Sequence, residues 1–491
     1  MVDRPPLQTF LAAAQLGLLA DLLLRGTPWG VNLALCVLVL AVSALVAPEP
    51  DRAGPAEQRL LWCAVGAALA VAWRDAPLLV VADSMAAGGL LVLALMHARG
   101  LRLGRAPVRA YLRTATRAVV GLVAEPFGAV TAPSPDPSPA FGRRARAVVV
   151  GVTLALPISA VFGVLLAAAD PLFERAMRAA FMWNAQTVAS HTVVTAVFAW
   201  LALGVLVGLV PRPALPASAE THPMALGLVE LGIPLGALAA LFAVFIGFQV
   251  PYFFGGASTV LATAALGYAD YARRGFFELV TVTALVVPVL VSAGSVLDRS
   301  DPRAVRGFRI LACALLGLVS LIAGSALYRL WLYYGAYGLT SDRLYAAAVM
   351  GWVGLVLGWF ALTVLRGRPG PFVAGALVSG LGVLACLNLV NPDGLVARVN
   401  LARGRAGAEL DVTYLGRLSA DAVPALAAGL ADLPLEARCE LTRALEARWR
   451  RDDPADWRTW NVARSRAVRW VGRWAGDCGW TGGSADGRLG D

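Results

Sequence analysis

The 491-residue chain is 58% hydrophobic and only 15% charged, so it has too few charged side chains to cover a water-soluble globule of this size. Its formal net charge is +10, and all 42 basic residues are arginine. A phosphate-loop NTPase, a protein kinase and a Schiff-base enzyme each need a lysine, so the composition excludes these classes. It predicts a membrane protein whose basic residues lie mostly in loops, with no nucleic acid as partner.

Eleven apolar windows are long enough, or nearly so, to cross a bilayer. They lie near residues 7–24, 29–47, 60–73, 78–97, 147–168, 187–210, 226–249, 276–297, 310–332, 344–365 and 371–390. We therefore predict an all-α integral membrane domain over residues 1–391 with about eleven transmembrane helices. Ten or twelve spans remain alternatives, because the third window is short and the first is weak. The first window is expected to be a retained span rather than a signal peptide, since Asp21 interrupts its end.

The loops between the windows differ in their arginine content. If the N-terminus lies inside, the inner loops hold nineteen arginines and the outer loops hold seven. Loops on the cytoplasmic side of a membrane protein are usually the richer in arginine. This bias predicts a cytoplasmic N-terminus and, after eleven spans, a C-terminal tail outside the membrane.

The longest inner loop, residues 98–146, combines a basic segment with a proline-rich linker. Its arginines recur at spacings of three and four, which predicts one helical face formed by Arg102, Arg105, Arg109, Arg113 and Arg117. This face could contact anionic lipid headgroups, or its charge could serve only to set the topology. The following TAPSPDPSPA has proline at alternate positions and cannot form a helix.

Residues 392–491 change to a polar composition and are predicted to fold as a small helical domain outside the membrane. A short strand is expected at Glu409–Tyr414, followed by three helices that begin after Ser419, Pro434 and Pro454. In the third helix, tryptophans fall near one face. That face either packs against the other two helices or lies on the membrane surface.

The six cysteines fall into two groups. Four lie in apolar windows and are expected to be inert packing residues: Cys36, Cys63, Cys313 and Cys386. Cys439 and Cys478 lie in the polar tail and are predicted to form a disulfide if the tail faces an oxidising compartment.

Several charged residues interrupt the apolar windows, and each costs about 2.5–3.5 kcal/mol near the centre of a span. In the predicted topology, five of them fall toward the outer side: Asp21, Asp83, Asp170, Glu278 and Arg329. They could form one polar cluster that serves as a substrate or proton site. Alternatively, each could reach water or pair only to fix helix packing. No catalytic motif, cofactor motif or metal-ligand spacing of histidines is found.

Several strings resemble a bacterial multi-pass membrane family described as domain of unknown function 4173. Among them, YARRGFFEL and YRLWLYYGAYGLT are long enough to be specific. The resemblance runs from the first window into the tail and implies a bacterial cytoplasmic (inner) membrane protein, without an established activity or catalytic residues. One departure is Val250-Pro251 before YFFGG, where the family resemblance leads us to expect a basic residue.

Three classes of function remain open. The first is a non-enzymatic sensing or scaffold component of the cell envelope, with lipid and other envelope proteins as partners. The second is a transporter or lipid-handling protein that uses the intramembrane charges. The third, least supported, is a membrane transferase acting on a lipid-linked substrate.

Overall fold

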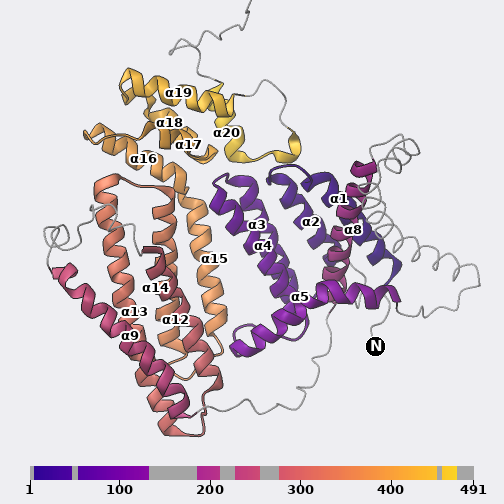
Figure 1. Cartoon of the computed structure of the whole chain (residues 1–491). Coiled ribbons are helices and arrows are strands. Elements are labelled where there is room, and N and C mark those ends of the chain that lie inside the picture. Colours follow the sequence, from indigo (N-terminus) through magenta and orange to yellow (C-terminus); the bar gives the residue numbers. More distant parts are fainter. Residues whose placement is uncertain are drawn as a thin grey trace, which may run out of the picture.

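The computed structural model describes residues 5–46, 53–131, 185–210, 227–254, 276–450 and 456–472, and all regular elements within these ranges are helices (Figure 1). The long helices are α1 (Leu7–Leu24), α2 (Val31–Val46), α3 (Pro55–Trp73), α4 (Pro77–Ala98), α5 (Val108–Thr131), α8 (Ala185–Gly208), α9 (Leu228–Phe254), α12 (Phe276–Val296), α13 (Pro302–Tyr337), α14 (Ser341–Thr363) and α15 (Phe372–Val390).

Seven helices of the described residues are long and apolar enough to cross a membrane: α1, α4, α8, α9, α13, α14 and α15. α2 and the segment Thr281–Val296 of α12 are apolar but shorter. Ten of the eleven predicted windows overlap a helix, whereas window 147–168 lies outside the described residues. The described residues are all-helical, as predicted, and their apolar helices suit a membrane protein, whereas the number of eleven spans stays a prediction.

The long helices form two bundles (Figure 1). The N-terminal bundle consists of α1–α5 and α8 around a core that includes Leu61 and Leu95. The C-terminal bundle consists of α9 and α12–α15 around Leu315 and Phe360. α15 joins the two bundles, because Val373 packs against both cores.

α5 crosses one end of the N-terminal bundle (Figure 1). Arg99, at the end of α4, donates a hydrogen bond of 2.8 Å to Glu125 of α5. The indole of Trp200 on α8 donates to the carbonyl of Val123 at 3.0 Å. Gly204 of α8 meets the backbone of Leu122 so closely that a Cβ there would overlap the Leu122 carbonyl oxygen. A glycine is therefore required where α5 and α8 cross.

Residues 392–472 form a third unit, here called the tail domain, over the opposite end of both bundles (Figure 1). Its helices are α16 (Pro392–Arg405), α17 (Val412–Arg417), α18 (Val423–Gly429), α19 (Leu435–Trp449) and α20 (Val462–Val471), with short 3-10 turns η1 (Ala420–Ala422), η2 (Leu430–Asp432) and η3 (Trp457–Thr459). They share a core that includes Val396, Leu426, Leu441 and Ala467. We call this end of the bundles the capped end and the other the α5 end.

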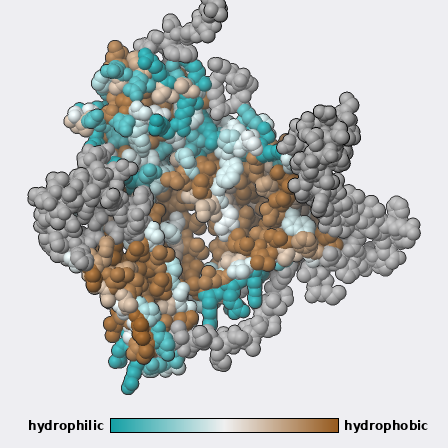
Figure 2. Space-filling view, viewed as in Figure 1, coloured by the Kyte–Doolittle hydropathy of each residue, from teal (hydrophilic) through white to brown (hydrophobic). Residues whose placement is uncertain are grey.

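The surface separates into three zones along the bundles. Figure 2 shows hydrophobic side chains over the bundles and hydrophilic ones over the tail domain and near the α5 end. Many large apolar side chains on the bundle helices are exposed, among them Leu18, Met85 and Ile233. This distribution is the one that a bilayer around the bundles requires.

Two predictions for the tail are wrong because local capping decides the structure. The strand at Glu409–Tyr414 is absent, since Asp411 accepts a 2.8 Å hydrogen bond from the Tyr414 backbone and opens α17 instead. α16 was not expected, although Asn391 caps it through the Gly394 backbone at 3.0 Å and Pro392 occupies its first turn. The string NPDG was the overlooked signal.

The third predicted tail helix is shorter than expected. α20 begins only at Val462, and its buried face consists of Ala463, Ala467 and Val471. Trp457 and Trp460 lie before the helix and are exposed. Trp457, Trp460 and Trp470 are all exposed and do not form its packing face, whereas Trp474 lies outside the described residues.

The crossing of α5 and α8 can be tested with two matched substitutions. Gly204→Ala should lower the melting temperature of the detergent-purified protein, because overpacking against a backbone atom typically costs about 1–3 kcal/mol. Gly66→Ala in α3 has no atom within 4 Å of the added Cβ, so it should leave the melting temperature unchanged or raise it. Equal effects of the two changes would contradict the close approach.

Candidate functional site

The predicted cluster of intramembrane charges is not assembled in the described part of the chain. Asp170 lies outside it, and Glu278 and Arg329 belong to helices but their side chains lie outside the description. Asp21 pairs with Arg25 at 3.3 Å and with His191 of α8. Asp83 instead accepts a hydrogen bond from Asn388 of α15. Asp21 and Asp83 therefore belong to different networks.

The predicted arginine face is shorter than the sequence indicated. α5 begins at Val108, so Arg102 and Arg105 lie in the preceding turn, and only Arg109, Arg113 and Arg117 follow one another along the helix. All five are exposed. The interpretation as a single five-arginine helical face is wrong, because Pro107 sets the start of the helix at the following residue.

Beside these arginines, α5 exposes an apolar stripe. It consists of Leu112, Val119, Val120, Val123 and Phe127. The opposite face, with Tyr111, Ala118 and Ala129, is buried in the bundle. An exposed apolar stripe next to arginines suits the headgroup level of a membrane. Contact with anionic lipid stays a prediction.

The most extensive polar arrangement lies at the capped end, where the α3–α4 loop enters the tail domain. The Asp421 carboxylate accepts hydrogen bonds from the backbone N–H groups of Asp75 at 2.6 Å and Ala76 at 3.0 Å. It also accepts one from Arg74 at 3.1 Å, and both side chains of this ion pair are buried. Arg74 Nε donates further to the Asn388 carbonyl at 2.7 Å. Burial raises the pKa of Asp421 above its ordinary value, and these donors oppose that effect.

The same loop is held from a second side. Asp75 accepts a 2.6 Å hydrogen bond from Arg464 and a 3.2 Å one from the backbone of Ala420. Asn461, which is fully buried, donates to the carbonyls of Val71 and Arg74 at 2.8 Å each. Hydrogen bonds from Asp421, Arg464 and Asn461 therefore hold the α3–α4 loop in position against the tail domain.

The tail domain also holds the α13–α14 turn of the C-terminal bundle. Asp393 accepts hydrogen bonds from the Ser341 hydroxyl at 2.6 Å and from the Ser419 backbone at 3.1 Å. Asn400 donates to the Leu339 carbonyl at 2.7 Å and accepts from the Leu339 N–H at 3.1 Å. The tail domain thereby bonds to hairpins of both bundles.

A third contact involves the α1–α2 turn. The N–H of Val31 donates to the Trp460 carbonyl at 2.9 Å, and Arg458 donates to the Leu22 carbonyl at 2.6 Å. A Cβ at Gly30 would stand 2.6 Å from that Trp460 oxygen. We call the contacts at the three turns, together with Asn388, the junction.

Three buried polar atoms beneath the junction have no hydrogen-bond partner: Asp83 Oδ2, Asn388 Oδ1 and Tyr345 Oη. Asp83 and Asn388 are 1% and 5% exposed. They come from α4, α15 and α14. Buried polar atoms are normally satisfied, so this group needs an explanation.

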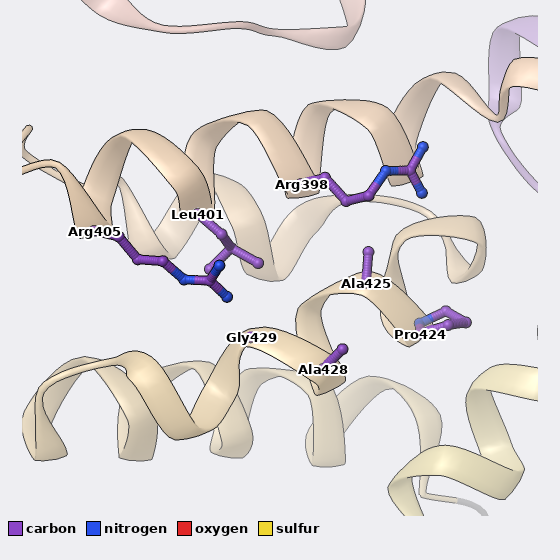
Figure 3. Close-up of a pocket in the computed structure, with 7 residues that line it drawn as sticks. All are labelled: Arg398, Leu401, Arg405, Pro424, Ala425, Ala428 and Gly429. Atoms are coloured by element: carbon purple, nitrogen blue, oxygen red, sulfur yellow. The ribbon is translucent and has the colours of Figure 1, made fainter.

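A shallow pocket of about 460 Å³ lies between α16 and α18 (Figure 3). Its lining combines Arg398 and Arg405 of α16 with small residues of α18 and its flanks. Arg405 pairs with Asp432. The lining contains no nucleophile or acid. In the described ranges, no group of three or more histidine, cysteine, aspartate or glutamate residues could hold a metal.

Residues 61–429 match the family model described as Domain of unknown function (DUF4153). The chain belongs to this family. The resemblance to domain of unknown function 4173 is therefore wrong, because the model that matches is a different one. The DUF4153 region includes both bundles from α3 onward and the tail domain up to α18. Neither a curated protein nor a solved structure shows significant similarity to the chain.

The sequence missed the junction of this DUF4153 protein for a physical reason. Arg74 and Asp75 are adjacent residues in a short turn, where charged residues are normally solvated, so nothing marked them as buried. Asp421 lies in an alanine-rich segment without a recognisable motif. The unusual feature was the charge pair in a turn of only three residues between two long apolar helices.

The structure describes only one of the two cysteines in the predicted disulfide. Cys439 is disulfide-bonded, whereas Cys36, Cys63, Cys313 and Cys386 are free. Cys478 lies outside the described residues. The pairing of Cys439 with Cys478 stays a prediction.

The junction predicts a large difference between two aspartates of the tail domain. Asp421→Asn should lower the free energy of unfolding by about 3 kcal/mol, because it leaves the buried Arg74 without its counter-charge. Asp432→Asn removes only a surface ion pair and should cost less than about 1 kcal/mol. Thermal unfolding and limited proteolysis of the purified proteins measure both. Similar stability of the two variants would contradict a central role for Asp421.

Proposed function

We propose that this protein is a non-enzymatic sensing or scaffold component of the bacterial cell envelope. The junction carries this proposal. Hydrogen bonds join the tail domain to hairpins of both bundles, buried at the α3–α4 turn and partly buried at the α13–α14 turn, so the position of the tail depends on how the bundles are placed. A partner bound to the tail would therefore respond to the membrane domain, which is the property that a sensor or scaffold needs.

The arginine distribution supports an orientation. The loops and helix ends of the α5 end contain Arg99, Arg102, Arg105, Arg109, Arg113, Arg117, Arg299, Arg303, Arg306, Arg309, Arg366 and Arg368, whereas the turns of the capped end contain Arg25, Arg74 and Arg343. By the positive-inside rule, this bias supports an orientation with the α5 end in the cytoplasm and the tail domain outside. The disulfide-bonded state of Cys439 supports the same side, since disulfides persist in oxidising compartments.

This orientation can be tested by labelling single cysteines in intact cells. In a background without native free cysteines, Ala428→Cys on the tail domain should react with a membrane-impermeant maleimide. Arg113→Cys on α5 should react only after the cells are permeabilised. Both positions are exposed in the structure. The reverse pattern would show that the arginine bias misleads and that the tail faces the cytoplasm.

The scaffold role can be tested through the junction itself. Crosslinking in native membranes should recover the same envelope proteins from wild type and from Asp432→Asn. In Asp421→Asn, the released tail should lose these partners while the membrane domain is still inserted. An identical partner set for the Asp421 variant, with proteolysis confirming a released tail, would eliminate the proposal.

A further inference from the structure

The inference concerns Asp83, which lies in the second turn of α4 beneath the junction. Its side chain is 1% exposed, and one oxygen accepts a 2.9 Å hydrogen bond from Asn388 Nδ2. The other oxygen has no partner. An ionised carboxylate buried in this way is costly unless a cation or further hydrogen bonds compensate it.

The missing partner has a definite chemistry. The two atoms left over in the Asp83 and Asn388 pair are both oxygens, and both can only accept. The Tyr345 hydroxyl is also buried without a partner, and it comes from α14, which packs against α15. The two oxygens need a hydrogen-bond donor or a cation, and the Tyr345 hydroxyl, which could donate, bonds to neither of them.

The neighbouring charges do not supply that cation. Arg74 is engaged by Asp421 and the Asn388 carbonyl, and Arg464 is engaged by Asp75. Asp393 is bonded to Ser341 and the Ser419 backbone rather than to a positive group. In the described contacts, neither guanidinium group is bonded to Asp83.

Acidic and histidine side chains on the helices packed against α4 are paired with other residues. Glu57 of α3 pairs with His97, Glu125 of α5 pairs with Arg99, and His191 of α8 pairs with Asp21. The thiols of Cys63 on α3 and Cys386 on α15 belong to exposed residues. In the described part of the chain, none of these groups neutralises Asp83.

We propose that Asp83, Asn388 and Tyr345 form a site for one small monovalent cation, either a proton or Na⁺. A proton on Asp83 would turn its free oxygen into a donor, so that acid and amide could bond in both directions. Na⁺ would instead use the free carboxylate, amide and phenol oxygens together with water. This site lies in the membrane domain and stands independently of the scaffold role.

The test compares Asp83→Asn with wild type by thermal unfolding of the full-length protein in detergent. Four buffers combine about pH 5.5 or about pH 8 with either sodium chloride or choline chloride at equal ionic strength. A cation bound only by the folded state raises the melting temperature. Asp342→Asn, an exposed carboxylate on α14, is the matched control and should follow wild type throughout.

For a Na⁺ site, sodium at about pH 8 should raise the wild-type melting temperature by a few degrees and leave Asp83→Asn unchanged. For a proton site, acidification in choline should stabilise wild type relative to Asp83→Asn, since a proton that favours the folded state adds stability at low pH and loses it as pH rises. If the melting temperatures of wild type and Asp83→Asn differ by the same amount in all four buffers, the proposal is overturned and an ordered water is left as the partner.

A second measurement covers the case in which Asp83→Asn does not fold. Infrared difference spectra of wild type report a protonated carboxylic acid directly, and Tyr345→Phe should weaken the sodium response several-fold by removing one oxygen. A wild type with neither a protonated acid band nor a sodium response would exclude both forms of the site.

Discussion

The structure depends on one buried carboxylate. Asp421 accepts two backbone N–H groups just before α4 and the guanidinium of Arg74. The N-terminus of a helix carries a partial positive charge and unpaired N–H groups, so a carboxylate at this position is favourable. Burial would make an unpaired Asp421 or Arg74 expensive, and each is therefore stable only in the presence of the other. The pair ties the α3–α4 turn to η1 of the tail domain.

This tie adds to the direct packing between the bundles, where α15 contacts α4 and α12 contacts α5. Inside lipid, helices associate mainly through van der Waals packing and hydrogen bonds, without a hydrophobic driving force. α15 packs against the cores of both bundles, and Asn388 links it to α4. The tail domain adds bonds to the α1–α2, α3–α4 and α13–α14 turns. The tail domain therefore connects the two bundles outside the lipid, where hydrogen bonds can add to the weak association of helices within it.

Hydropathy was enough to predict the positions of the helices. It was not enough to predict contacts between residues that lie far apart in the chain. Ten apolar windows overlap helices, since the length and polarity of a span follow from the bilayer. The junction could not be found in this way, because Arg74 and Asp421 are 347 residues apart and neither has a motif. Asp83 was recognised as unusual, but its partner Asn388 was not, since one asparagine in an apolar window costs less than a charge. Local capping by Asp411 and Asn391 was readable and was overlooked.

The junction can form only late in the synthesis of the chain. Residues that bury Arg74 and Asp75 come from the last hundred of the chain, so the ribosome completes all the described long helices before η1 and α20 exist. Until then, these polar turns must remain hydrated at the membrane surface. Folding of the tail domain is therefore also the step that withdraws Arg74 and Asp75 from water.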